Sequence, residues 1–529
     1  MKYFIAFVLV ALIFLGIYLK NILIISILPI LILFSLLILF NLPAWKASAI
    51  ASLFTLFISF LFTTQTINSW IIGAIFGIWN VGWLIFWAIT FFNVFKLSGL
   101  LEDFKNWILK NSVQDIRFLS LILAFSLGAL IEGITGFGTP WAYVVPILVS
   151  FGIPELKAIT ISAISNTAPV SFGAFGLPMI VLSSVTGLPI MLLSHAEAII
   201  TFIEAFFVVF LVLYIVDGIR GIKEAWPYAL VAALSYGIVQ YSVATYLGPY
   251  LPDVLGSISS IIALFIFSKF FKPKNTLMPK EIKIKKIKNF KKSFFALMFF
   301  IAFLAFWTFP FLPFTNFSLT SFEFKFYSEE FKKEFSVFYS FNPFAIGTGA
   351  FFAFLLSLLI IRPKIGIIKS AFETTAKQTF GAILTSIFVF SLAYTFNFVG
   401  FAYSIALYAS QLGLLFFIIS PFLGALGAAL TGSNTSSNAI FGKIQYLTGI
   451  KLGFPPALLP IANSTGAELA KPIAPQTVSV GVTTSKYIGK EGEIIKNNFK
   501  YVLFLVSVLM LILFILMKVY PYPFMLYAS

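Results

Sequence analysis

The chain has 529 residues, of which 60% are hydrophobic and only 10% are charged, and its formal net charge is +16. A soluble globular protein carries about 25% charged residues, and one of this length has no interior large enough to bury so much apolar surface. The composition therefore excludes a soluble protein and predicts an integral membrane protein. The sequence contains no cysteine, which excludes disulfides and thiolate metal sites.

Apolar stretches occur throughout the chain, many near the length of about 20 residues that a helix needs to cross a bilayer. The first, residues 3–19, lacks a small-residue cleavage site, so we interpret it as a membrane helix and not as a secretory signal. The other expected spans are 21–41, 47–67, 70–94, 118–134, 141–153, 197–216, 226–247, 254–268, 293–311, 343–361, 379–398, 401–420 and 500–518. The predicted fold class is an all-α polytopic membrane protein with about 12–14 transmembrane helices, located in the cell (plasma) membrane.

The positive charge is concentrated in one segment. Ten lysines lie between Lys269 and Lys292, with Glu281 the only acid among them. Such a run can bind nucleic acid or anionic lipid, but its position between two hydrophobic regions is typical of a loop that sets membrane topology. The positive-inside rule places it in the cytoplasm. The stretch EFKFYSEEFKKEF, within 311–342, has four acids against three lysines and is expected outside.

This loop divides the chain into two membrane halves, 1–268 and 293–529, joined by residues 269–292. Two regions, 157–190 and 421–485, are apolar but rich in Gly, Pro, Ser, Thr and Asn. Irregular backbone survives at membrane depth only when it is buried in protein or lines a wet cavity. Such interruptions at corresponding places in two halves are typical of a transporter's binding site.

The two halves also align with each other. FSLGALIEGITGFGTP (125–140) matches PFLGALGAALTGSNTS (421–436) at an offset of 296 residues, and ISNTAP (164–169) lies over IANSTG (461–466) at 297. We therefore predict two related repeats, inverted relative to each other, with re-entrant or broken helices. Their cores are expected at 118–190 and 415–485.

The polar residues at these interruptions are candidate substrate ligands. Gly and Pro free backbone amides and carbonyls, and the N-terminus of a half-helix offers N–H donors and partial positive charge to an anion. The alternative is that small polar residues only join packed helices. Neutral donors cluster at Thr135, Ser165, Asn166, Thr167, Ser433, Asn434, Thr435, Ser436, Asn438, Asn463, Ser464 and Thr465.

Ionisable groups at membrane depth are costly and suggest function. Glu132 precedes TGFGTP, and its carboxyl group could carry a coupling proton or accept bonds from exposed backbone amides. Glu468 and Lys471 are three residues apart and could form a static pair if that segment is helical. Lys471 could instead pair with a substrate carboxylate or with Glu132. Glu204 is an isolated acid in the apolar stretch after residue 197, and the sequence assigns it no role.

Four blocks resemble the lactate permease family, and the similarity spans roughly residues 95–500. The blocks are GALIEGITGFGTPWAYVVPIL, ISNTAPVSFGAFGLP, LTGSNTSSNAIFGKIQ and residues 461–485. The resemblance implies a secondary transporter that takes up lactate, glycolate or a similar 2-hydroxy monocarboxylate with a proton. By match to the family's motifs it carries over Glu132, Gly133, Gly136, Gly138, Thr139, Pro140, Asn166, Ser433, Thr435, Ser436, Asn438, Asn463, Lys471, Pro475 and Gln476.

The chain departs from the family at two positions. Asn434 stands where members usually have Asp, and Glu468 stands where a neutral residue is expected. If the missing Asp normally helps to carry the proton, that role has moved to Glu132 or Glu468, or the coupling differs. We therefore name Glu132 and Glu468 as proton-coupling candidates and Lys471 as a ligand of the carboxylate.

Three other functions compete with this interpretation. A sodium-coupled carboxylate transporter is the nearest, because Asn, Ser, Thr and free carbonyls suit sodium. A membrane enzyme would need catalytic acids or a metal site at a membrane face, and the polar clusters lack them, so we expect no enzyme, metal or cofactor. A passive anion channel would not accumulate its substrate. The expected partners are a small carboxylate, a proton and the lipid bilayer.

Overall fold

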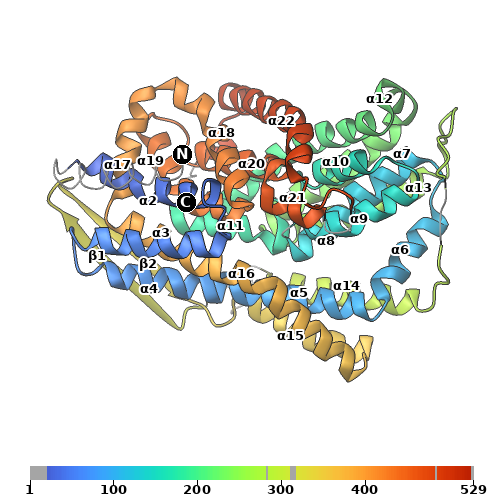
Figure 1. Cartoon of the computed structure of the whole chain (residues 1–529), viewed down its shortest axis with the longest axis horizontal. Helices are drawn as coiled ribbons and strands as arrows, with labels where there is room; N and C mark the ends of the chain where they lie inside the picture. The colour runs from blue at the N-terminus through green and yellow to red at the C-terminus, as the bar shows by residue number, and fades with distance from the viewer. Residues whose placement is uncertain are drawn as a thin grey trace.

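The computed structural model describes residues 21–136, 138–280, 284–309, 312, 317–482 and 485–525. The predicted membrane helix at residues 3–19 lies outside the described residues. Helices make up nearly all of the regular structure in the described part, which confirms the predicted all-α class (Figure 1).

The helices of the N-terminal part follow one another with short connections. They are α2 (Ile22–Ile38), α3 (Ala44–Ser59), α4 (Thr66–Phe76), α5 (Trp83–Leu97), α6 (Leu100–Asn111), α7 (Ile116–Ser120), α8 (Gly128–Thr135), α9 (Thr139–Ser150), α10 (Glu155–Ser165), α11 (Gly173–Thr186), α12 (Ile190–Tyr246) and α13 (Pro252–Phe267). Two π-helical segments, η1 (Gly77–Gly82) and η2 (Leu121–Leu127), connect α4 to α5 and α7 to α8.

The C-terminal part contains the remaining helices and one hairpin of strands. They are α14 (Phe290–Trp307), β1 (Thr320–Ser328), β2 (Lys333–Phe341), α15 (Ile346–Ile361), α16 (Ile365–Phe398), α17 (Phe401–Ala409), α18 (Leu414–Thr431), α19 (Asn434–Lys451), α20 (Leu458–Leu469), α21 (Pro475–Gly481) and α22 (Glu491–Val519). Short 3₁₀ turns are η3 (Ser410–Leu412), η4 (Lys471–Ile473) and η5 (Tyr522–Phe524).

Several of these helices have the length and hydropathy of membrane-spanning segments. Within the described residues, seven are long and apolar enough to span one: Thr66–Leu97, Ile116–Thr135, Ile190–Tyr246, Phe290–Trp307, Ile365–Phe398, Leu414–Thr431 and Glu491–Val519. The longest, α12, breaks at Asp217 and Gly218, where Gly218 has φ of 62°. Its two parts fold back on each other, so that Gly237 lies against Phe202. This break explains why the sequence predicts two spans there.

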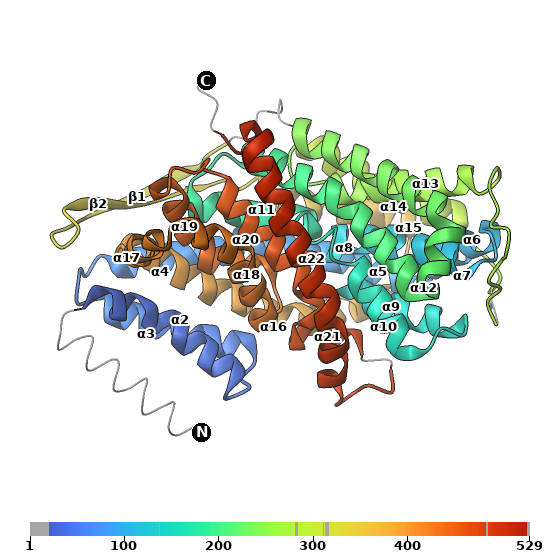
Figure 2. The same cartoon turned by 90° about the horizontal axis from the view of Figure 1, so that it is seen from above.

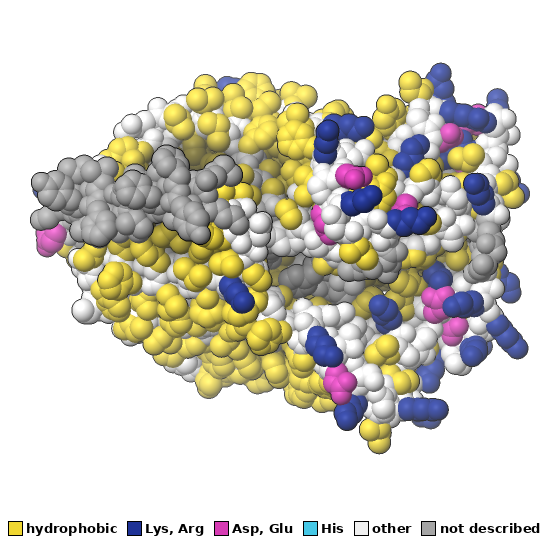
Figure 3. Space-filling model, viewed as in Figure 1, with side chains coloured by type: hydrophobic (Ala, Val, Ile, Leu, Met, Phe, Trp, Pro, Cys, Tyr) yellow, Lys and Arg dark blue, Asp and Glu magenta, His cyan; other side chains and the backbone are white. Residues whose placement is uncertain are grey.

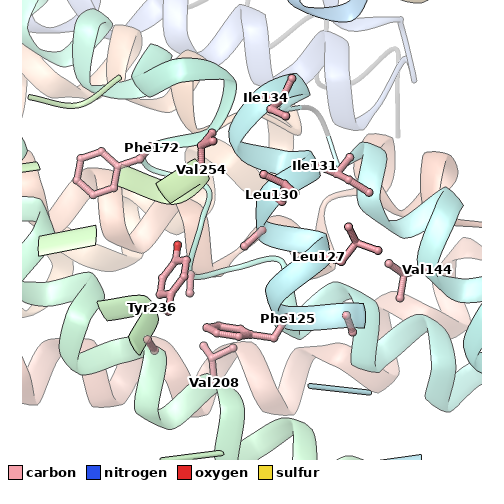
Figure 4. Packing of buried hydrophobic residues seen from close by; sticks show 14 of the residues in the cluster. Phe125, Leu127, Leu130, Ile131, Ile134, Val144, Phe172, Val208, Tyr236 and Val254 are labelled. Carbon is pink, nitrogen blue, oxygen red and sulfur yellow. The ribbon is translucent and has the colours of Figure 1, made fainter. Parts of the chain in front are cut away.

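The helices of the two sequence halves interleave. In the first of two clusters of buried apolar residues, α12 packs on α13 and α18 packs on α20; in the second, α16 packs on α3 and α4. Figure 4 shows Leu130, Ile131 and Ile134 projecting from α8 into the first cluster. Below them, the rings of Phe125 and Tyr236 meet edge to face, with centroids 5.1 Å apart. Every residue of α8 is buried, so this helix lies inside the protein.

We expected residues 311–342 to form a polar loop. Part of this region forms a hairpin of two strands, β1 and β2. Alternating Phe and polar residues give β1 and β2 a period of two, which suits an antiparallel pair, and Phe324 stands opposite Val337. The hairpin projects at one end of the molecule, while the lysine-rich segment follows the opposite end (Figures 1 and 2). Lys and Arg side chains gather toward that second end on the face shown in Figure 3.

Candidate functional site

Two helical hairpins carry the polar motifs into the protein. In the first, α8 ends at Thr135 and α9 begins at Thr139, and the tip contains Gly136 and Gly138, both with positive φ. In the second, α18 ends at Thr431, and Gly432 has φ of 75°. Glycine is suited to both tips because it adopts such φ values without steric cost.

At the second hairpin tip, the next helix begins with a side-chain N-cap. Ser433 caps α19, and its hydroxyl accepts a hydrogen bond from the Ser436 amide at 3.2 Å. This is the usual role of serine at an N-cap. The remaining amides of the first turn of α19 give this tip partial positive charge.

Two broken helices face these hairpins. α10 ends at Ser165, and the chain passes through turns before α11, whose first residues Ala174, Phe175 and Gly176 have left-handed backbone conformations. Left-handed conformations cost non-glycine residues about 1–3 kcal/mol and persist only where the surroundings impose them. In the C-terminal part, α20 ends at Leu469, and α21 begins at Pro475 after a short 3₁₀ turn. The order hairpin and then broken helix is therefore the same in both segments.

Three of the polar blocks meet in one buried cluster of neutral side chains. Asn438 donates to Ser464 Oγ at 3.2 Å and accepts from Asn463 Nδ2 at 3.0 Å. Asn434 donates to Ser171 Oγ at 3.2 Å, and the Ser171 and Ser464 hydroxyls are 3.4 Å apart. The cluster therefore joins the first broken helix, the second hairpin and the second broken helix. We call these five residues the amide–hydroxyl cluster.

Several polar atoms in the polar blocks have no hydrogen-bond partner within the described residues. They are Nδ2 and Oδ1 of Asn166, Oγ of Ser165, Oδ1 of Asn463 and Oε1 of Gln476. Buried polar groups in proteins are almost always paired, so each unpaired one needs an explanation. A polar ligand is one explanation, since it would supply the donors and acceptors that these groups lack.

One buried ion pair lies beside the cluster. Lys471 Nζ is 2.7 Å from Glu132 Oε1, and the two side chains are 6% and 1% exposed. The other carboxylate oxygen of Glu132 accepts a hydrogen bond from the Gly138 amide at 3.1 Å. Gly173, two residues after Ser171, packs against the Glu132 side chain. Of the three partners that the sequence allowed for Lys471, the structure pairs it with Glu132.

Glu468 lies in a different environment from Glu132. Its Oε2 accepts a hydrogen bond from the Ser171 amide at 3.0 Å. Its other oxygen has no donor among the residues that the structure describes. Glu468 is therefore bonded to the amide–hydroxyl cluster and not to Lys471.

Some predicted ligands are engaged locally instead. The hydroxyls of Thr135, Thr139 and Thr167 donate to backbone carbonyls of Ile131, Gly136 and Ile164, at 2.8, 3.0 and 2.9 Å. These threonines shape the hairpin tip and the helix ends. Thr465 donates to Glu197 Oε1 at 3.1 Å. Gln476 donates to the Leu430 carbonyl at 2.9 Å and thereby ties α21 to the second hairpin. Thr435 and Ser436 lie in the first turn of α19.

The sequence motifs assigned no role to several buried polar residues. They are Ser171, Glu197, Glu204, Tyr236, Gln240 and Asp253. Glu197 and Glu204 had a detectable signal, since two acids seven residues apart in an apolar helix lie on one face. Tyr236 and Gln240 donate to Asp253 Oδ1 at 2.8 and 3.0 Å. Neither the spacing nor the type of these residues predicts the two hydrogen bonds from the sequence.

The sequence model described as L-lactate permease matches residues 22–520. The chain belongs to the L-lactate permease family. Members of this permease family are transporters, so the chain is a multi-pass transport protein of the plasma membrane and not an enzyme. The recognition made from the four sequence blocks is confirmed.

Named relatives resemble this permease along most of its length. "Glycolate permease GlcA" of Escherichia coli is 30% identical over 476 residues, covering 83% of this chain and 84% of the relative. "L-lactate permease" of Salmonella typhimurium is 29% identical over 506 residues, covering 90% and 92%. The Bacillus subtilis protein of the same name is 29% identical over 486 residues, covering 84% and 86%.

Two solved transporter structures resemble the permease more weakly. The Alcanivorax borkumensis YdaH transporter has 16% identity and a TM-score of 0.46, and covers 87% of this chain and 88% of its own. Neisseria gonorrhoeae MtrF has 14% identity and a TM-score of 0.47, covering 86% and 84%. These scores are too low to establish a shared fold.

Proposed function

We propose that this permease takes up lactate or glycolate together with a proton, by secondary active transport. The substrate class is supported by relatives named as L-lactate permeases and as a glycolate permease. The observation that carries the coupling is the buried ion pair between Lys471 and Glu132.

The pair supports coupling through charge balance. An ion pair in a low-dielectric interior is tolerable because its two charges compensate each other. A monocarboxylate that binds Lys471 has to displace Glu132, and would leave that carboxylate buried without a cation. Protonation of Glu132 removes this cost, because Lys471 and the substrate then form the neutral pair. Anion and proton therefore bind together more favourably than either binds alone.

The amide–hydroxyl cluster provides the remaining substrate contacts in this proposal. A 2-hydroxy monocarboxylate offers a carboxylate and a hydroxyl, and both form hydrogen bonds with neutral amides and hydroxyls. Asn166 and Asn463 have free polar atoms for that purpose. The amides at the N-terminus of α19 would add stabilisation of the negative charge.

The test is uptake of labelled lactate into proteoliposomes under an inward proton gradient, with the membrane potential held at zero and sodium absent. We expect accumulation that a protonophore abolishes and that glycolate reduces by competition. Uptake that begins only after sodium is added would replace the proton with sodium as the coupling ion. Equilibration without accumulation would indicate a passive anion channel.

The variant Glu132→Gln tests the assigned coupling residue. We expect it to abolish accumulation driven by the pH gradient, while exchange of labelled for unlabelled lactate continues, because a neutral residue 132 leaves Lys471 free to bind the anion. Glu373→Gln is the matched control, since Glu373 is an exposed acid on α16. If Glu132→Gln still concentrates lactate, Glu132 is not the proton carrier.

A further inference from the structure

Three carboxyl groups lie together in the protein interior, apart from the Glu132–Lys471 pair. Glu197 and Glu204 are seven residues apart on α12, and Glu468 comes from α20. Their exposed fractions are 0%, 3% and 0%. We call these residues the three-glutamate cluster.

The cluster has too few hydrogen-bond donors for three carboxylates. Glu197 Oε1 accepts from the Thr465 hydroxyl, and Glu468 Oε2 accepts from the Ser171 amide. The other four oxygens, including both of Glu204, have no donor in the described part of the chain. The Glu204 carboxyl lies against that of Glu468, within reach of a hydrogen bond. Two carboxyl groups can form that bond only if one of them carries a proton.

The part of the chain that the structure describes gives these carboxyl groups no ion-pair partner. No ion pair among the described residues includes Glu197, Glu204 or Glu468. Lys471, three residues after Glu468, is bonded to Glu132 instead. Tyr236, on the second part of α12, donates its hydroxyl to Asp253 and not to any of the three glutamates. Like charges that lie close together without a compensating cation disfavour ionisation of all of them, so the cluster favours a bound proton.

We propose that Glu204 and Glu468 share a proton and form a second proton-binding site that loads together with the substrate. The inference rests on the proposed proton-coupled transport and adds a second proton to it. A proton from solution binds a Glu204 oxygen, and the resulting O–H donates to the free oxygen of Glu468. The proton leaves to the other side after the substrate is released. One anion then moves with two protons, and each cycle carries one net positive charge.

Ser171 provides the link between this site and the substrate. Its amide donates to Glu468, while its hydroxyl contacts Asn434 and Ser464 in the amide–hydroxyl cluster. A change of charge on Glu468 therefore acts directly on a residue that also holds the proposed substrate ligands. Anion binding on one side of Ser171 favours a proton on the other side, because both charges lie in the same low-dielectric interior.

The test is whether membrane potential drives uptake when there is no pH gradient. Wild-type proteoliposomes with an inside-negative potassium diffusion potential should accumulate lactate roughly 40-fold for each 100 mV, since one charge crossing 100 mV is worth about 2.3 kcal/mol and about 1.4 kcal/mol is tenfold. Accumulation under a pH gradient at zero potential, combined with no response to potential, would overturn the second site and leave the proposed function intact. No accumulation under either gradient would refute the proposed function, and this inference with it.

The variant Glu204→Gln identifies the residues. Its amide donates permanently to Glu468 and cannot release a proton, so we expect accumulation under a pH gradient to persist and the response to potential to disappear. Glu468→Gln is the second variant if Glu204→Gln does not fold, and it should likewise lose the response to potential. Glu373→Gln is again the control and should respond as wild type. A wild-type response to potential in both glutamine variants would assign the second proton elsewhere.

Discussion

At the scale of single residues, the position of Lys471 beyond the end of its helix decides its partner. Glu468 and Lys471 are three apart, and a continuous helix would place them on one face. However, α20 ends at Leu469, and Lys471 begins a 3₁₀ turn. Its ammonium group therefore reaches Glu132, which is 339 residues away in the sequence. Both residues stood out in the sequence as charges within apolar segments. No local sequence pattern predicts a pairing between residues so far apart.

The pairing predicts a particular pattern of stability. Glu132→Gln and Lys471→Met should each lower the free energy of unfolding by about 3–5 kcal/mol, because each leaves one buried charge without its partner. The double variant should recover most of the loss while remaining inactive in pH-driven uptake. The measurement is the denaturation midpoint of purified protein in detergent.

The control for this series is Lys325→Met in the β1–β2 hairpin. Lys325 also lies near two acids, Glu323 at 3.4 Å and Glu334 at 3.7 Å, but its side chain is 55% exposed. Surface pairs contribute little, so we expect no measurable change in the midpoint. A double variant as unstable as the sum of the single ones would show that the pair is not the source of the effect.

At the scale of elements, the sequence predicted where the helices break but not how closely they pack. Gly, Pro and Asn mark the hairpin tips and the broken helices, because these residues permit turns and unpaired backbone. The contact between α18 and α20 depends on a different property of glycine. A Cβ at Gly424 would overlap the carbonyl oxygen of Asn463, and one at Gly466 would overlap that of Pro421. Small residues allow such backbone approach in membrane helices.

This contact predicts that Gly424→Ala impairs transport. The added methyl group has only backbone atoms to displace, so it should push α18 away from α20 and move Asn463 from its bond with Asn438. We expect at least a tenfold loss of lactate uptake and a lower denaturation midpoint. Gly366→Ala is the control, because nothing lies within 4 Å of a Cβ at that position on α16. Equal uptake by Gly424→Ala and Gly366→Ala would mean that the close packing is irrelevant to function.

At the scale of the whole molecule, composition was sufficient for the fold class, while the arrangement of the halves required the structure. The sequence places the lysine-rich segment and the acidic hairpin on opposite sides of the membrane, and the two lie at opposite ends of the molecule (Figure 2). The backbone of the lysine-rich segment is hydrogen-bonded to α6. The amides of Lys288 and Asn289 donate to Asp103 on α6 at 3.1 and 2.8 Å. No local sequence pattern predicts that helices from the two halves interleave.

The absence of cysteine makes the orientation directly measurable. We predict that Lys286→Cys, in the lysine-rich segment, faces the cytoplasm, and that Lys325→Cys, in the hairpin, faces outward; both native side chains are exposed. A membrane-impermeant maleimide added to intact cells should label only the second variant, and should label the first after the membrane is opened. The physical reason is that lysine-rich loops are retained on the cytoplasmic side during insertion, whereas acidic residues have little influence on topology. Labelling of Lys286→Cys in intact cells would invert the orientation and place the proton source for uptake at the other end of the molecule.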